Sequence, residues 1–187
     1  MRLKALLRDG LAASVCAALI SATVAAVYAQ VPLPVSVADS QGRFAMNFPA
    51  DWEVTTKRQG MVALLGAGPA TAGHRPTVNV VVESLPNPMS PAAYAVAAER
   101  LAKAVFHNYT VIQEAAATVR GQPVYYRYFT WETNTGVGLY QMQVFFTAGQ
   151  TGYVVTGSTI NDRDRILSEM PLVTQIIQSF RVVRATN

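Results

Sequence analysis

The glycine-rich segment from Gly68 to Gly73 has the two-glycine spacing of a phosphate-binding loop, so nucleotide chemistry is the first function to consider. Such a loop needs a lysine that reaches the phosphates and a hydroxyl that binds Mg²⁺. His74 stands at the lysine position and Arg75 at the hydroxyl position. The segment therefore predicts a loop between two strands and not a nucleotide site.

Histidines and acidic residues offer little for catalysis or metal binding. Only His74 and His107 are available as a general base or a metal ligand, and no third ligand accompanies them at a recognisable spacing. Ser158 lacks the Gly-x-Ser-x-Gly elbow of a hydrolase. Asp162 and Asp164 resemble the start of a calcium loop, but arginines interleave them and neither the glycine nor the distal glutamate of such a loop follows. The sequence predicts no catalytic residue, no metal site and no cofactor.

More than half of the aromatic residues lie between Tyr125 and Tyr153. One interpretation is an aromatic groove that holds a small hydrophobic ligand, and the other is core packing. These residues alternate within expected strands and do not gather around polar anchors. The pattern favours the core.

The elements that position these aromatics are three long strands between Pro123 and Thr159, with period-2 alternation from Val124 to Thr130 and from Leu139 to Thr147. A three-residue loop at 134–136 pairs Thr130 with Tyr140, Tyr128 with Met142, Tyr126 with Val144 and Val124 with Phe146. A two-residue loop at Gln150 and Thr151 then places Val155 beside Phe146 and Gly157 beside Val144. One face of this meander is almost wholly apolar.

The opposite face carries the candidate partner-binding residues. The expected register aligns Arg127, Gln143 and Ser158 across three strands, with Trp131 nearby. If a helix covers this face, the polar row is satisfied internally. If the row is exposed, an arginine and a tryptophan on a rigid sheet are the residue types of a binding hot spot.

Further strands at 43–48, 61–65, 77–83 and 109–119 should extend the same sheet. Ser90 followed by Pro91 predicts the start of a helix that ends near His107 or Asn108. One face of this helix holds Tyr94, Ala98, Leu101 and Val105. A final helix begins at Asn161 and Asp162, and Pro171 should kink or split it. The fold class is therefore α+β, a largely antiparallel β-sheet covered by helices.

Residues 1–29 are expected to be a secretory signal peptide, because basic residues precede an apolar run from Leu11 to Val27. Val27 and Ala29 suit a cleavage site that would leave Gln30 as the first mature residue. The alternative is a retained membrane anchor. Cys16, the single cysteine, lies in this segment, so the mature chain would contain no thiol.

Residues 30–39 are expected to form an extended arm, which is a second candidate for partner binding, and 40–187 to form one domain. The formal charge of +4 includes three basic residues and one acidic residue of the leader, so +2 remains after cleavage. That balance does not imply nucleic acid as a partner.

One series of features follows the order of a known superfamily: Phe44, Phe48-Pro49, Trp52, a valine-rich strand, a Ser-capped helix, Gly152-Tyr153-Val154-Val155-Thr156, and finally Ile176 with Ser179-Phe180. This order resembles the superfamily that contains PsbP and DcrB, over roughly Ser40 to Val183. The resemblance implies an α/β/α sandwich, usually without catalysis. PsbP stabilises a membrane complex of photosystem II, and DcrB is a bacterial cell-envelope protein.

The resemblance implies an exported, non-enzymatic protein of the periplasm or an equivalent lumen. Such a protein would bind or stabilise a protein partner or a membrane-associated complex. No functional residue carries over from the superfamily. The alternative function is a carrier of a small hydrophobic ligand that uses the aromatic sheet.

Overall fold

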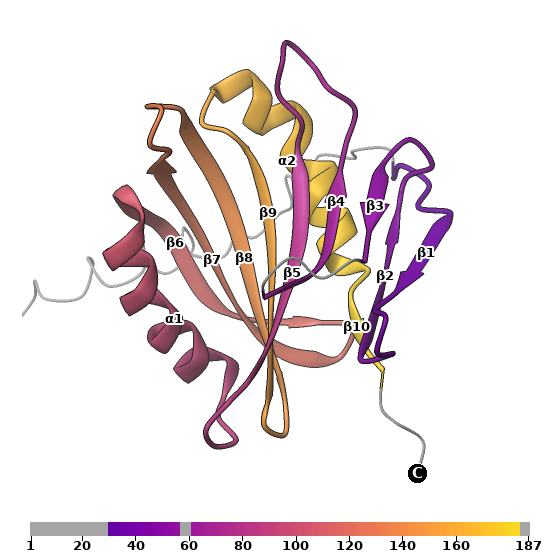
Figure 1. Ribbon diagram of the computed structural model, residues 1–187, viewed down its shortest axis with the longest axis vertical. Coiled ribbons are helices and arrows are strands. Elements are labelled where there is room, and N and C mark those ends of the chain that lie inside the picture. Colours follow the sequence, from indigo (N-terminus) through magenta and orange to yellow (C-terminus); the bar gives the residue numbers. More distant parts are fainter. Residues whose placement is uncertain (1–29, 57–60, 184–187) are drawn as a thin grey trace, which may run out of the picture.

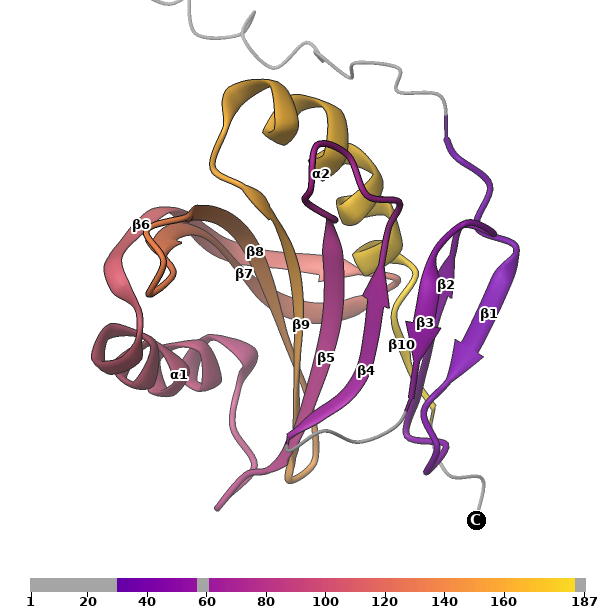
Figure 2. The same ribbon diagram turned by 45° about the horizontal axis from the view of Figure 1, so that its top comes forward.

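A computed structural model describes residues 30–56 and 61–183. The expected signal peptide, with its cleavage site, lies outside the described residues. Seven strands form an antiparallel sheet in the order β3-β4-β5-β9-β8-β7-β6, and two helices lie on opposite faces of it (Figures 1 and 2). The bounds are β3 (Glu53–Thr55), β4 (Val62–Ala67), β5 (Thr77–Ser84), α1 (Pro91–Val105), β6 (His107–Val119), β7 (Gln122–Glu132), β8 (Gly138–Ala148), β9 (Thr151–Ile160) and α2 (Arg163–Gln178). The predicted α+β class, with an antiparallel sheet between helices, is confirmed.

The register between β7 and β8 follows the prediction. Thr130 pairs with Tyr140, Tyr128 with Met142 and Tyr126 with Val144. Val124 and Phe146 lie beyond the paired stretch, which ends at Tyr125 and Phe145. The amide of Thr133 donates to the carbonyl of Val137 at 2.9 Å, and Gly136 supplies the positive φ of +79° that closes the three-residue loop.

The register between β8 and β9 was predicted wrongly. Val144 pairs with Val155, and Met142 with Gly157, which is a shift of two residues. The loop residues are Gly149 and Gln150, because only Gly149, with φ +58°, adopts the left-handed conformation at this turn. An even shift keeps every side chain on its predicted face but moves the polar row.

A second sheet was not predicted. Strands β1 (Val35–Ala38) and β10 (Arg181–Val182) pair with the two edges of β2 (Phe44–Phe48). The expected strand at 43–48 therefore does not extend the main sheet, and part of the expected arm is a strand. Apolar side chains of β2 are fully buried in the core beside α2.

Helix α1 begins as predicted but is rotated about its axis. The Ser90 hydroxyl accepts from the amide of Ala93 at 3.2 Å, as an N-cap does. Tyr94 and Ala95 are buried, whereas the side chains of Leu101 and Val105 are 71% and 70% exposed. The predicted apolar face is thus buried only at its amino-terminal end.

Helix α2 is continuous through Pro171, so the predicted split does not occur. The Asp162 carboxylate accepts from the amides of Asp164 and Arg165 and caps the first turn. Buried residues on both sides of the proline, Met170 and Val173 among them, hold the helix on the core. The helix lies so close to β9 that a Cβ on Gly157 would be 2.1 Å from Cγ1 of Val173.

Candidate functional site

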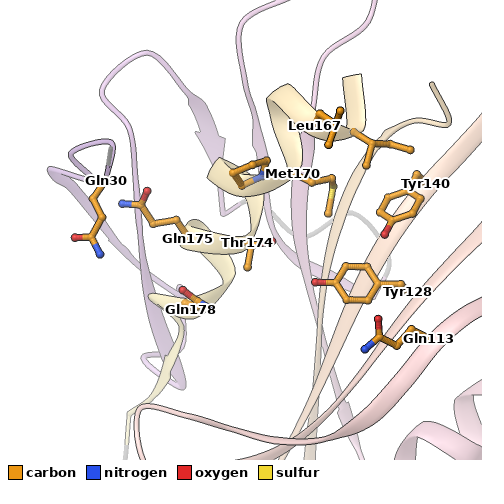
Figure 3. Close-up of a pocket in the computed structure, with 11 residues that line it drawn as sticks. Gln30, Gln113, Tyr128, Tyr140, Leu167, Met170, Thr174, Gln175 and Gln178 are labelled. Carbon is orange, nitrogen blue, oxygen red and sulfur yellow. The ribbon is translucent and has the colours of Figure 1, made fainter. Parts of the chain in front are cut away.

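An open groove lies between α2 and the strands β6, β7 and β8. It consists of two adjoining hollows of about 620 Å³ and about 350 Å³. The two hollows share Gln113, Tyr128, Thr174 and Gln178 as lining residues, so they form one continuous site (Figure 3). Their volumes lie in the range of ligand-binding pockets.

Three half-buried tyrosines form one wall of the groove. Tyr126 and Tyr128 meet edge to face with ring centroids 5.7 Å apart, and Tyr128 lies 5.9 Å from Tyr140. Burial raises the pKa values of the Tyr128 and Tyr140 hydroxyls, so both stay protonated at neutral pH. The Gln113 side chain donates to the Tyr126 hydroxyl at 2.9 Å. The wall offers aromatic surface together with neutral hydrogen-bonding groups.

The smaller hollow ends on apolar core residues. Val124, Met142, Val144 and Ile177 line its inner part. The Thr174 hydroxyl donates to the sulfur of Met142 at 3.7 Å and so marks the boundary between the apolar and the polar parts. A side chain that enters from the groove would meet apolar surface at the bottom.

No charged side chain is among the described residues that line the two hollows. Polar character comes from the tyrosines, from threonines and from four glutamines, Gln30, Gln113, Gln175 and Gln178. Amides and hydroxyls can both donate and accept hydrogen bonds, but they are poor nucleophiles and poor bases. The two hollows therefore present neutral hydrogen-bonding groups beside aromatic surface.

Gln175 already binds main chain at the edge of this groove. Its Oε1 accepts from the amide of Val31 at 3.2 Å, and its Nε2 donates to the carbonyl of Val31 at 2.6 Å. A third hollow, of about 480 Å³, is lined by Gln30 to Leu33 together with Gln175 and Gln178. The amino-terminal segment thus lies beside the groove and contributes Gln30 to its lining.

Arg127, the first of the predicted partner-binding residues, is only 1% exposed and lies beneath α1. Its guanidinium donates to Glu114 at 2.7 Å, to Glu99 at 3.3 Å and to the carbonyl of Ala95 at 3.3 Å. Burial alone would lower the pKa of Arg127, but its hydrogen bond to Glu114 and the neighbouring acidic charges raise it. The arginine stays charged and joins α1, β6 and β7.

Of the row predicted across three strands, Gln143 lies beside Arg127 but Ser158 does not. Arg127 aligns with Gln143 and Thr156, whereas Ser158 aligns with Gln141. Ser158 is buried and accepts from Gln141 at 3.1 Å. Partner binding at these residues stays a prediction, and burial restricts it to Trp131 and Gln143, which are partly exposed.

Trp131 belongs to an aromatic cluster at the carboxyl end of α1. Its ring stacks on Phe106 with centroids 4.3 Å apart, and Phe106 also stacks on Phe129. The indole N–H is buried without a hydrogen-bond partner among the described residues. The cluster secures the turn from α1 into β6.

Neither the histidines nor the glycine-rich segment lines the two hollows of the groove. Thr71 and His74 form a tight main-chain turn between β4 and β5, as expected of a loop. Burial lowers the pKa of His74, which is therefore neutral at physiological pH. Within the described part of the chain, no three His, Cys, Asp or Glu side chains gather as a metal ion requires. No described helix has the length and hydropathy to cross a bilayer.

Sequence reasoning missed the polar half of the groove. The sequence predicts the correct face for Tyr126, Tyr128 and Tyr140, but it favours core packing for them over a groove. It gives no indication that Gln113, Gln175 and Gln178 line the same site. Gln175 and Gln178 are three residues apart on one helix, and Gln113 lies on a strand more than 60 positions earlier. Only the tertiary fold brings them together.

Solved structures with the same fold come from several organisms. LpqN of Mycobacterium tuberculosis, described as involved in cell envelope biogenesis, is 14% identical, with a TM-score of 0.60 over 80% of this chain and 90% of LpqN. Cyanobacterial PsbP from Synechocystis sp. PCC 6803 is 14% identical, with a TM-score of 0.57 over 80% and 92%. The Saccharomyces cerevisiae Ran-binding protein Mog1p is 9% identical, with a TM-score of 0.56 over 80% and 95%.

These likenesses confirm the predicted PsbP-like fold. A search of curated proteins finds no significant match. The sequence profile of the DcrB family matches residues 45–170, which span more than half of the sequence and include β3 to β9 and the first half of α2. The chain belongs to the DcrB family.

Proposed function

We propose that this chain is an exported, non-catalytic binding protein of the cell envelope whose groove between α2 and β6–β8 receives a protein partner. The observation that carries the proposal is the open groove with three tyrosines and no charged side chain among its described lining residues. Membership of the DcrB family and the fold shared with LpqN support a role in the envelope. The fold shared with the Ran-binding protein Mog1p supports protein binding.

Tyrosine is well suited to such a surface. Its ring buries a large area, loses little conformational entropy and keeps a hydroxyl for hydrogen bonding, which explains its enrichment in protein interfaces. Tyr128 and Tyr140 are already held by packing against each other and by the sheet below. A preorganised wall of this kind limits the cost of association.

The test is a comparison of groove variants in capture from envelope extract. Gln178 is exposed, so Gln178→Arg should leave the melting temperature unchanged and place an unpaired charge in the groove. We expect Gln178→Arg to capture the protein that the wild-type chain binds at least tenfold more weakly. Gln150→Arg, on the exposed β8–β9 turn, is the matched control and should capture normally. Unchanged capture by Gln178→Arg would remove the groove from the interface.

Export is tested by intact mass. The protein recovered from the envelope should begin at Gln30, because Val27 and Ala29 form the predicted cleavage site. A mass that includes residues 1–29 would show that the segment is not cleaved and would favour the alternative of a retained membrane anchor.

The second candidate is a carrier of a small hydrophobic ligand, which the apolar bottom of the smaller hollow favours. A carrier should retain a lipid or another apolar molecule through gentle purification. Native mass spectrometry would then show an added mass that disappears in Gln178→Arg, which places a charge at the lining of both hollows and leaves the core unchanged. If the purified protein contains no ligand and still captures its protein partner, the carrier function is excluded.

A further inference from the structure

We propose that the groove recognises an extended, uncharged stretch of polypeptide through its main chain, and that the glutamine side chains make the recognising hydrogen bonds. This inference rests on the proposed function and adds to it the chemical class of the bound segment. The inference concerns which groups of the bound segment the groove recognises, and it does not identify the partner protein.

The chain itself supplies an example of this recognition. Gln175 makes two hydrogen bonds with one residue, accepting from the amide of Val31 and donating to its carbonyl. A primary amide presents one acceptor and two donors, so it matches the donor and acceptor of a peptide unit. Such a contact uses no side-chain atom of Val31 and therefore does not depend on its identity.

The same chemistry continues into the groove. Gln178 follows Gln175 by three residues on α2 and lines both hollows as well as the one beside Val31. Among the described residues, the Gln178 side chain has no hydrogen-bond partner. Gln113, on β6, lies across the groove from the helix (Figure 3). Its side chain donates a hydrogen bond to the Tyr126 hydroxyl. A segment that enters the groove would thus meet amides on both sides.

The remaining lining determines which side chains the segment carries. An extended chain directs alternate side chains to opposite sides, so every second residue can point toward the sheet. Those residues would meet Met142 and Val144 in the smaller hollow, which suits small apolar side chains. Within the two hollows, a charged side chain would lose hydration without meeting an ion partner among the described lining residues, because Arg120 lines only the third hollow beside Val31. The favoured segment is therefore uncharged and alternates small apolar with polar residues.

The experiment measures binding of blocked eight-residue peptides to the full chain by calorimetry. The probes are a pool of uncharged peptides with valine at alternate positions, the same pool with N-methylated amides, and the same pool with glutamate at the polar positions. We expect saturable binding of the first pool and at least tenfold weaker binding of the other two. N-methylation removes main-chain donors and leaves the side chains unchanged, so it isolates main-chain recognition.

Variants place the binding in the groove. Gln178→Met keeps the length of the side chain but removes both hydrogen-bonding groups, and we expect it to weaken binding of the uncharged pool about five- to tenfold. Gln150→Met, on the β8–β9 turn, should bind like the wild type. Palmitate serves as the apolar probe without peptide amides, and saturable binding of palmitate in place of the peptides would overturn the inference.

Failure of this inference differs from failure of the proposed function. Equal affinity for the N-methylated pool, or no binding of any pool, overturns main-chain recognition. If Gln178→Arg still abolishes capture of the envelope partner in that case, the groove remains the interface and binds a folded surface instead. If capture is also unaffected, the proposed function fails as well.

Discussion

Arg127 is the residue on which the α1 side of the sheet depends most. Its charge is compensated by Glu114 and Glu99 and by the carbonyl of Ala95, all within 3.3 Å. Arg127→Ala would remove the cationic partner of Glu114 and the donor to the Ala95 carbonyl, whereas Glu99 keeps its ion pair with Lys103 at 2.7 Å. We expect a loss of about 3–5 kcal/mol in the free energy of unfolding. Denaturant titration measures it.

The matched control for Arg127→Ala is Arg100→Ala on the exposed face of α1, which should change stability by less than about 0.5 kcal/mol. Arg127→Met, which preserves the packing of the side-chain stem, should be milder than Arg127→Ala. A neutral Arg127→Ala combined with impaired partner capture would mean that α1 moves aside and exposes the arginine.

Asp39 gives the fold a predictable dependence on pH. Burial alone would raise the pKa of its carboxyl, but the hydrogen bonds and charge of Arg43, at 2.6 and 3.1 Å, lower it below the ordinary value of 3.8. A lowered folded-state pKa stabilises the protein above the ordinary pKa, and this contribution is lost as the pH falls through the folded value. Acid should therefore destabilise the wild type below about pH 4.

Asp39→Asn isolates that contribution. The variant should be less stable by about 1–2 kcal/mol at pH 7, because a charge-assisted pair is replaced by a neutral contact. Its melting temperature should fall less steeply than that of the wild type between pH 5 and pH 2. Parallel acid profiles of the two proteins would show that Asp39 does not carry the effect.

At the scale of elements, the rotation of α1 follows from the same arginine. Glu99 must face Arg127, so the helix turns Leu101 outward and places Ala95 against the sheet. We expect Leu101→Gln to change stability by less than about 0.5 kcal/mol and Ala95→Leu to cost about 1–3 kcal/mol by overpacking. Thermal melts of the two variants measure these changes. A large loss of stability in Leu101→Gln would mean that the Leu101 side chain packs against another part of the protein.

The contact of α2 with β9 depends on the missing side chain of Gly157. A Cβ there would lie 2.1 Å from Val173 Cγ1 and 3.0 Å from Ile177 Cδ1, and both residues are fully buried. Gly157→Ala should cost about 1–3 kcal/mol, because α2 must shift away from the sheet. Gly138→Ala, whose Cβ would be 3.4 Å from Asn161, is the control and should be much milder in the same urea titration.

At the scale of the whole molecule, the long elements could be predicted and the short ones could not. Alternation at 124–130 and 139–147 identified β7 and β8, and Ser90 with Pro91 identified the start of α1. Strands β1 and β10, which pair with β2 in the second sheet, have four and two residues, which is too short for a period to be visible. The second sheet was missed for that reason.

Two further features depend on packing and not on local pattern. Glycines on both sides of the β8–β9 turn allow more than one loop, and the observed register is the one that puts Gly157 beneath Val173. The sequence around Arg127 does not predict its ion partners, because Glu99 and Glu114 lie on other elements. The groove likewise draws its glutamines from α2 and β6.

Strand β2 is paired on one side with β1 and on the other with β10, the last strand of the described chain. Contacts between residues so far apart in the sequence form late, because a long loop must close before they are made. Phe180, which precedes β10, packs in the core against Phe44 and Phe146. During synthesis or export, the core cannot close until Phe180 and β10 have emerged, so we expect the domain to reach its folded state only after this segment is free of the ribosome or the export channel.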